Sequence, residues 1–213
     1  RDRGYDVLGV EYRELAVEKM RSLLGIEALQ GFFEELADSM IAGGRRHEII
    51  SMWETLEHVL YPRVVLEQAH RLLTPGGLIG ITVPNFDNLQ VKLLREHCFH
   101  CLGGPGNAGH INMFTPSTLT RMLEATGFEV LHMETEGASS YYDVVAFLAE
   151  RYEVINSYHN AIRQRLDRSP LAASAYSTGT VNALLKLSPV WKVVENALQK
   201  GAIIFAVGRK KNL

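Results

Sequence analysis

A continuous apolar segment at residues 78–83, Leu-Ile-Gly-Ile-Thr-Val, is the feature that most constrains the fold of this chain. It follows a Pro-Gly-Gly sequence at Pro75–Gly77, which predicts a turn. A strand with no alternating polar face is typical of a sheet that is covered on both sides, as in α/β proteins. The segment therefore predicts a buried strand in a largely parallel sheet.

Strand and helix patterns alternate around that segment. Shorter apolar runs predict further strands, at residues 5–10, 26–29, 48–52, 128–131 and 201–208. Apolar residues at helical spacing lie between them, so we expect a doubly wound α/β sheet. Beyond Gly137 the pattern changes to long helical segments joined by small residues. We expect one domain, with a sheet core at 1–137, a helical insertion at 138–200, and a last strand and basic tail at 201–213.

Composition narrows the classes of function. With 213 residues and 46% hydrophobic content, the chain can bury one good core. A formal net charge of −2 argues against a nucleic-acid-binding protein. No apolar run is long enough to cross a bilayer. The two cysteines, Cys98 and Cys101, fit a reducing compartment, so we expect a cytoplasmic protein.

Two carboxylates and an imidazole follow the predicted strand at 48–52, in the sequence Glu54-Thr-Leu-Glu57-His58. In open α/β sheets, ligands bind at the carboxyl ends of the strands. We therefore expect these three side chains to line an active site.

Four blocks of the sequence, taken in order, resemble the class I S-adenosylmethionine-dependent methyltransferases, particularly the ubiquinone-biosynthesis O-methyltransferases. They are Gly4–Glu11, Glu48–His58, Leu72–Leu78 and His110–Phe128. The resemblance implies a Rossmann-like sheet that is mostly parallel, with an antiparallel last strand. It also implies a first strand and a glycine-rich loop before the first block, which this sequence lacks. We expect the chain to be a fragment of a longer product; the alternative is that a partner completes it.

The resemblance implies S-adenosylmethionine as cofactor. The residues expected to bind it are Glu11, Tyr12, Phe32, Phe33, Met52 and Trp53. Glu11 would accept hydrogen bonds from the ribose hydroxyls. Phe32 stands where the family often has an acidic residue, so the adenine contact would be apolar. The alternatives are a solvated surface acid for Glu11 and ordinary packing for the aromatic residues.

The E-x-x-E-H arrangement of Glu54, Glu57 and His58 implies, in the ubiquinone-type enzymes, a Mg²⁺ site that holds a catechol-like substrate. A metal there would lower the pKa of a phenol. The alternative is that the residues line the active site without metal. In that case His58 is the leading general base, because an imidazole titrates near neutral pH. Glu57 and His110 are the further catalytic candidates, with His110 and Phe114 over the acceptor pocket.

Three other segments carry weaker signals. His97-Cys-Phe-His-Cys101 resembles a zinc motif, but adjacent ligands suit a tetrahedral ion poorly, so we expect it to line the substrate mouth. Gly103–Asn107 predicts a flexible lid. Tyr141 and Tyr142 are candidate acceptor contacts from the insertion.

The sequence thus predicts methyl transfer from S-adenosylmethionine to a small-molecule acceptor, with oxygen as the expected nucleophile. The first alternative is a truncated or non-catalytic α/β module that does not hold cofactor unaided. A nucleotide-dependent oxidoreductase is a third possibility, but the sequence has no glycine-rich fingerprint for it.

Overall fold

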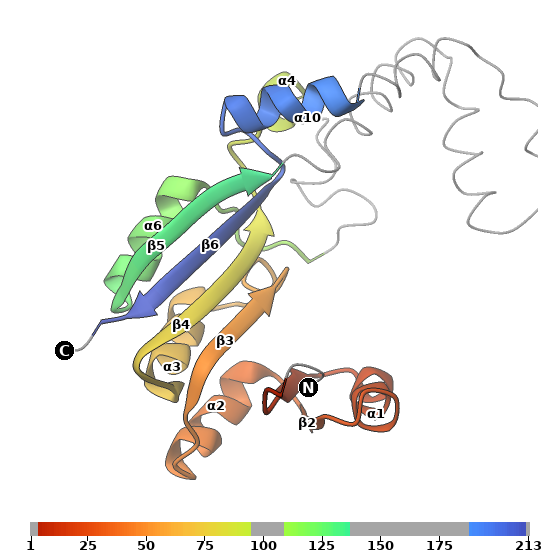
Figure 1. Cartoon of the computed structure of the whole chain (residues 1–213), viewed down its shortest axis with the longest axis vertical. Helices are drawn as coiled ribbons and strands as arrows, with labels where there is room; N and C mark the ends of the chain where they lie inside the picture. The colour runs from red at the N-terminus through yellow and green to blue at the C-terminus, as the bar shows by residue number, and fades with distance from the viewer. Residues whose placement is uncertain (1–3, 95–108, 137–187, 212–213) are drawn as a thin grey trace, which may run out of the picture.

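The computed structural model describes residues 4–94, 109–136 and 188–211 of the chain (Figure 1). Its strands are β1 (Leu8–Glu11), β2 (Glu27–Gln30), β3 (His47–Trp53), β4 (Leu73–Pro84), β5 (Phe128–Glu136) and β6 (Ile203–Lys210). Its helices are α1 (Glu14–Ser22), α2 (Phe33–Ala42), α3 (Pro62–Leu72), α4 (Leu89–Leu94), α6 (Pro116–Ala125) and α10 (Ser188–Ala197). The alternation of strands and helices confirms the predicted α/β class.

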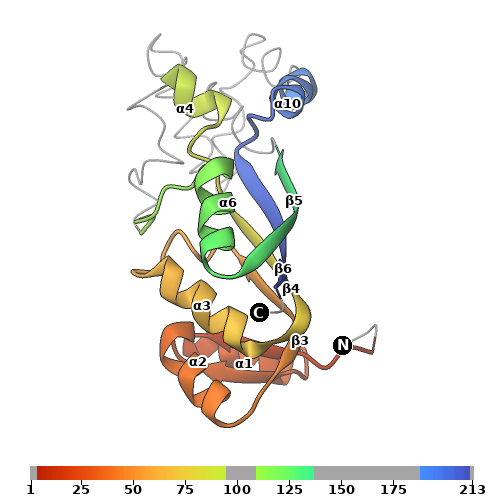
Figure 2. The same cartoon turned by 90° about the vertical axis from the view of Figure 1, so that its left-hand side faces the viewer.

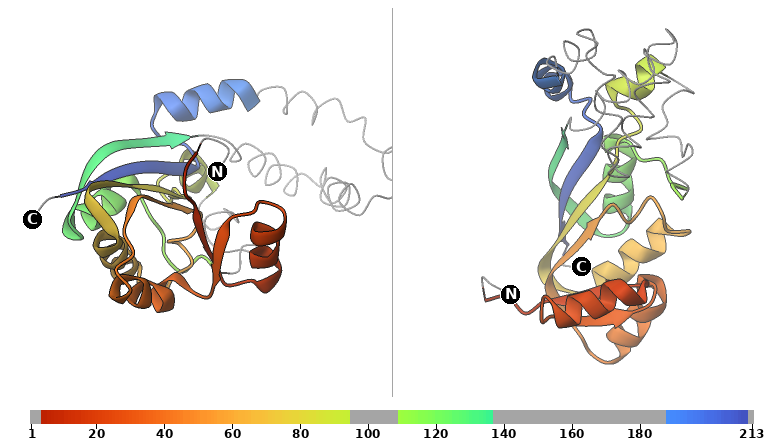
Figure 3. Two further views of the ribbon diagram at one scale, coloured as in Figure 1. Left: turned by 60° about the horizontal axis from the view of Figure 1, so that its bottom comes forward. Right: turned by 90° about the vertical axis from the view of Figure 1, so that its right-hand side faces the viewer.

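The described strands form two sheets instead of the single sheet that the alternation predicted. β1 and β2 pair in parallel, and a larger mixed sheet has the order β3-β4-β6-β5. No strand pairing within the described residues joins β1 to β3, although the β1–β2 unit lies beside the β3 edge of the larger sheet (Figures 1 and 3). The last strand, β6, runs antiparallel to both of its neighbours, as predicted.

Helices α3 and α6 cover one face of the larger sheet (Figure 2). In α3, Val65, Leu66 and Ala69 are fully or almost fully buried, because the spacing i, i+1, i+4 places them on one helical face. They pack with residues of β4 and β6 in the main core, where fully burying one large aliphatic side chain contributes about 1.5–3 kcal/mol. This packing fixes β3 and β4 as the rigid frame behind the site.

The Pro75–Gly77 sequence lies inside β4 and not before it. His47 pairs with Leu73, but Ile49, two residues later, already pairs with Leu78. The intervening residues of β4 form an irregularity in which Gly76 has φ +73°, a left-handed conformation that suits glycine. The predicted turn is therefore a bulge within a longer strand.

The parallel strands β3 and β4 end at the same edge of the sheet, at Trp53 and Pro84 (Figure 1). A bridge between Asn85 and Phe114 brings the segment before α6 to this edge. The carboxyl edge thus collects residues that are far apart in the sequence.

Of the predicted insertion at 138–200, the described part contains α10, and the rest lies outside the described residues together with the His97–Cys101 segment, the Gly103–Asn107 segment, Tyr141 and Tyr142. None of the described helices combines the length and the apolar character needed to cross a membrane.

Candidate functional site

The turn out of β3 is held in a strained conformation by β4. Glu54 has φ +48°, in the left-handed region that costs a residue with a side chain about 1–2 kcal/mol. Its backbone N–H donates to the carbonyl oxygen of Thr82 at 3.0 Å and to the Thr82 hydroxyl at 3.2 Å. These two bonds fix the direction in which the chain leaves β3 at the edge of the sheet.

Glu57 is the most unusual side chain of this turn. It is 1% exposed, and within the described part of the chain neither carboxylate oxygen has a hydrogen-bond partner. Burial raises the pKa of the Glu57 carboxyl to about 7, and the charge of Glu54 adds to the rise, whereas the residue's own backbone N–H lowers it. Near neutral pH this carboxyl is therefore able both to accept and to donate a proton.

One ring nitrogen of His58 is hydrogen-bonded to the backbone, and the other faces Glu57. Its Nδ1 lies 3.0 Å from the carbonyl oxygen of Gly109. A carbonyl only accepts, so Nδ1 carries the hydrogen and Nε2 of the neutral ring keeps its lone pair. This Nε2 is 3.8 Å from Oε1 of Glu57. Nε2 of His58 and the buried carboxyl of Glu57 thus lie close to each other.

His110 joins these two residues from a distant part of the chain. Its ring centroid is 4.7 Å from that of His58, with the planes at 63°. One ligand atom from each of Glu57, His58 and His110 lies within 4.8 Å of the others. These three residues, called here the Glu57–His58–His110 cluster, are the ones predicted as catalytic, and the structure brings them together.

The segment that carries His110 is bonded directly to the turn that carries Glu57. The backbone N–H groups of Ile111 and Asn112 donate to the carbonyl oxygen of Glu57 at 2.8 and 3.1 Å. The Asn112 side chain donates to the carbonyl oxygens of Leu56 at 3.2 Å and Val59 at 2.6 Å. Sequence reasoning missed Asn112; its signal was a polar residue between the apolar Ile111 and Met113.

Phe114 was expected over the acceptor pocket, but the structure buries it in the main core, where it is 3% exposed. Its carbonyl oxygen accepts from the N–H of Phe86 at 2.7 Å, which holds the backbone against the end of β4. The ring consequently packs inward, and Phe114 anchors the segment instead of lining an acceptor site.

The cluster fits a magnesium ion poorly. Mg²⁺ prefers oxygen ligands, whereas two of the three groups brought together are imidazoles. Glu54, the second carboxylate of the predicted metal set, is not in this group, although its charge contributes to the raised pKa of Glu57. Of the predicted set of Glu54, Glu57 and His58, the structure thus brings Glu57 and His58 together with His110, and Glu54 is not in this group.

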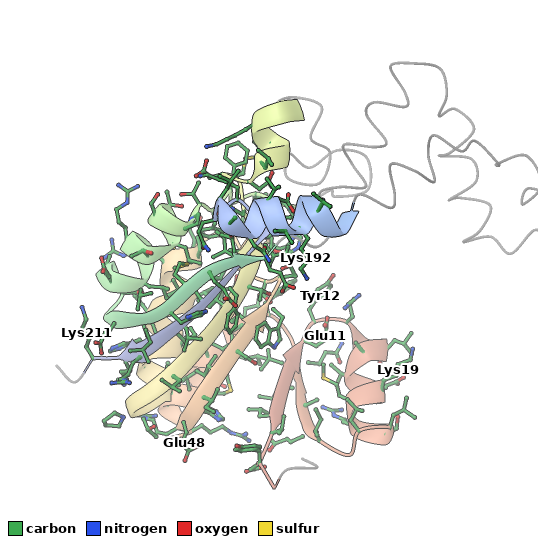
Figure 4. The ribbon with its side chains drawn as sticks, turned by 45° about the horizontal axis from the view of Figure 1, so that its top comes forward. Glu11, Tyr12, Lys19, Glu48, Lys192 and Lys211 are labelled. Carbon is green, nitrogen blue, oxygen red and sulfur yellow. The ribbon has the colours of Figure 1, made fainter. Side chains whose placement is uncertain are left out.

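Glu11 lies at the carboxyl end of β1, on the side of the molecule that faces Lys192 (Figure 4). One carboxylate oxygen accepts from the backbone N–H of Arg13 at 2.9 Å and from its Nε at 3.1 Å. The hydrogen bond from the Arg13 side chain is the main reason why the pKa of Glu11 is lowered. The group is therefore a charged acceptor near neutral pH, and a carboxylate has lone pairs for further donors.

An exposed aromatic pair lies next to Glu11. The rings of Tyr12 and Phe32 stack with centroids 5.2 Å apart and planes at 11°, and both residues are more than half exposed. The neighbouring Phe33 instead packs against both hydrophobic clusters. Of the two phenylalanines proposed to contact the cofactor, Phe32 has the more exposed ring.

Met52 and Trp53 lie on opposite faces of β3, because side chains alternate along a strand. Met52 is 6% exposed and belongs to the main core. Trp53 is 56% exposed and stacks on Phe205 of β6, with ring centroids 6.1 Å apart. The two residues therefore do not share one surface, and Trp53 is the one that a ligand could contact.

Comparison with known proteins adds to this geometry. Residues 1–133 match the model of a family described as a methyltransferase domain. The chain is 26% identical over 137 residues to a ubiquinone biosynthesis O-methyltransferase of Leptothrix cholodnii, covering 61% of this chain and 57% of that protein. It is 29% identical over 136 residues to the enzyme of the same name from Idiomarina loihiensis, covering 60% of this chain and 54% of that protein. The chain thus spans just over half the length of these relatives.

Among solved structures, a SAM-dependent methyltransferase from Archaeoglobus fulgidus aligns with a TM-score of 0.56 at 13% identity. The alignment covers 98% of this chain and 78% of that one. At this identity the likeness concerns the fold alone.

Proposed function

Because this chain belongs to the family of S-adenosylmethionine-dependent methyltransferases, we propose that it transfers the cofactor's methyl group to an oxygen of a small molecule. The observation that carries the choice of oxygen is the Glu57–His58–His110 cluster, in which a buried carboxyl lies close to the His58 nitrogen that is not bonded to Gly109. A hydroxyl acceptor loses a proton on methylation, and this cluster offers groups that take it.

In the proposed reaction the acceptor oxygen attacks the methyl carbon in line with the carbon–sulfur bond. The oxygen–carbon bond forms, the carbon–sulfur bond breaks, and its electron pair stays on the sulfur of S-adenosylhomocysteine. The hydroxyl proton passes to Nε2 of His58, whose Nδ1–H remains bonded to the Gly109 carbonyl. Glu57, 3.8 Å away, balances the positive charge of the resulting imidazolium. No step runs through magnesium, because the donor set suits that ion poorly.

The cofactor would lie between the ends of β1 and β3. Glu11 would accept the ribose hydroxyls, and the exposed rings of Tyr12 and Phe32 would contact the adenine. Trp53 would contact the charged sulfonium through its ring face. These roles follow the sequence resemblance, and the exposure of Tyr12, Phe32 and Trp53 supports them.

We further propose that one more parallel strand, with the glycine-rich loop that follows it, joins the two sheets. Within the described residues, β1 pairs only with β2 and β3 pairs only with β4, so each has an edge that a strand can pair with. The two units already share a helix layer, since α2 packs against α3. The divided sheet also favours the alternative that this chain by itself is a module unable to hold cofactor.

Calorimetric titration with S-adenosylhomocysteine distinguishes these possibilities. We expect no measurable binding by this chain and micromolar binding by a version extended upstream. Tight binding by this chain alone would contradict the need for a further strand. Absence of binding by every extended version would contradict the proposed function.

The role of Glu11 is tested in the extended version. Glu11→Gln should weaken binding about ten- to hundredfold, because hydrogen bonds to a charged group contribute about 1.5–3 kcal/mol. Glu14→Gln, a change of a neighbouring acid in the first turn of α1, is the matched control and should bind as the unchanged protein does. Equal affinities for both variants would remove Glu11 from the site.

A further inference from the structure

Asn112 is placed to hold both imidazoles of the cluster in position. It lies two residues after His110, and its side-chain amide reaches across to the turn that carries His58. The same Nδ2 donates to the carbonyl oxygen of Leu56, before Glu57, and to that of Val59, after His58. The two bonds therefore hold the turn on either side of Glu57 and His58, its two reactive residues.

The backbone of the same segment is also hydrogen-bonded to the turn, at a point between Leu56 and Val59. The N–H of Asn112 donates to the carbonyl oxygen of Glu57 at 3.1 Å, alongside that of Ile111 at 2.8 Å. Within the turn itself, the N–H of His58 donates to the carbonyl oxygen of Thr55 at 3.0 Å, and the Thr55 hydroxyl donates to the carbonyl oxygen of Trp53 at 3.0 Å. The orientation of the turn against the His110 segment thus depends largely on residues 111 and 112.

That orientation decides the state of His58. The Nδ1–H of His58 reaches the carbonyl oxygen of Gly109, which lies at the start of the same segment that Asn112 fastens. The His110 ring, 4.7 Å from that of His58, is carried by this segment as well. If the segment moves relative to the turn, the bond that keeps Nε2 unprotonated and the contact between the rings are lost together.

We infer that Asn112 is a positioning residue of the methyl-transfer site, which sets the tautomer of His58 and its contact with His110 by bonding the two segments that carry them. The inference rests on the proposed function for its catalytic meaning. The geometric part of the inference does not depend on the proposed function, because the positioning concerns the protein's own atoms and needs no cofactor or acceptor.

The test uses nitrogen-15 NMR of the histidine rings of the whole chain, at a pH where they are neutral. The unchanged protein should show His58 with its hydrogen on Nδ1 and a ring-to-ring nuclear Overhauser contact between His58 and His110. Asn112→Ala removes the amide but keeps the backbone bonds, and Asn112→Asp keeps the shape but has no hydrogen to donate. Both variants should lose the Nδ1–H signature and the contact between the rings.

Gln68→Ala is the matched control. Gln68 is a buried amide on α3 that donates to the carbonyl oxygen of Glu34 at 3.0 Å, in the contact between α2 and α3. The Gln68→Ala variant should have a lower midpoint temperature of unfolding, while both histidine signals stay unchanged. The inference is overturned if either Asn112 variant retains both signals, if Gln68→Ala also loses them, or if neither Asn112 variant folds. An extended version that keeps both signals but does not bind S-adenosylhomocysteine contradicts the proposed function alone.

Discussion

At the scale of single residues, Glu57 combines a chemical use with a cost in stability. Its carboxyl is 1% exposed, and its pKa is raised by burial from an ordinary value of 4.5 to about 7. Between these two values the folded protein binds a proton that the unfolded chain releases. The free energy of unfolding therefore falls as the pH rises through this window, and the loss is complete above pH 7.

Glu57→Gln should remove this pH dependence. At pH 8 the variant should be more stable than the unchanged protein by up to about 3 kcal/mol, since each unit of pKa shift corresponds to about 1.4 kcal/mol. At pH 4 the two should differ little, because the carboxyl is then protonated in both states. Urea unfolding at the two pH values measures the difference.

Glu67→Gln serves as the control for that series. Glu67 is a half-exposed acid on α3 that pairs with Arg63, so its replacement should change stability by less than about 1 kcal/mol at either pH. An equal effect of Glu57→Gln at both pH values would show that its carboxyl is not desolvated in the folded state.

The sequence predicted which residues would meet at this edge, but not how their atoms would be used. Glu57, His58 and His110 could be named because each follows a predicted strand or belongs to a recognisable block. Phe32 and Phe33 are identical neighbours, and only packing decides that one ring is more than half exposed and the other is partly buried against the core. The hydrogen bonds of Asn112 to carbonyl oxygens more than fifty residues away leave no periodic signal in the sequence.

At the scale of secondary-structure elements, the start of α6 links helix stability to the site. Thr115 caps the helix by accepting from the N–H of Thr118 at 3.2 Å, and the Thr118 hydroxyl accepts in return from the N–H of Thr115 at 2.8 Å. Pro116 occupies the first turn, where its missing N–H costs nothing. This cap follows directly on the segment that carries His110, so it defines where that segment ends.

Thr115→Ala should lower the free energy of unfolding by about 1 kcal/mol, the usual cost of removing such a cap. Thr115→Ser keeps a hydroxyl that can accept the same bond and should lose only a fraction of this. Chemical unfolding followed by circular dichroism measures both. Equal stability of the Ala and Ser variants would show that the hydroxyl contributes nothing.

Some boundaries of helices and strands follow from local sequence patterns, whereas others are set by pairing between strands. The cap at Thr115 and Pro116 depends on a local signal, a threonine followed directly by a proline. The strand predicted at 128–131 extends to Glu136, since β5 continues to pair with β6 along its whole length. The Pro75–Gly77 sequence lies inside β4 because pairing with β3 resumes after the bulge. These two outcomes depend on neighbouring strands that a local pattern does not contain.

At the scale of the whole molecule, the two sheets differ greatly in the core that supports them. The main cluster joins β3, β4, β5, β6, α3 and α6. The second cluster has only three buried members, Ala37, Met40 and Leu72, with partly buried neighbours from β1 and β2. Because local stability follows the buried apolar contacts around each strand, the β1–β2 unit should open more readily than the larger sheet.

Native-state hydrogen exchange should show this difference within one sample. The hydrogen-bonded amides of β1 and β2 should exchange about a hundredfold faster or more than those of β4 and β6, which corresponds to an opening free energy lower by about 2.7 kcal/mol or more. In a version extended upstream, a strand that bonds to both β1 and β3 would couple the two units, so the difference should shrink. Equal protection of both sheets in this chain would mean that they already unfold as one unit, and the proposed additional strand would lose its energetic role.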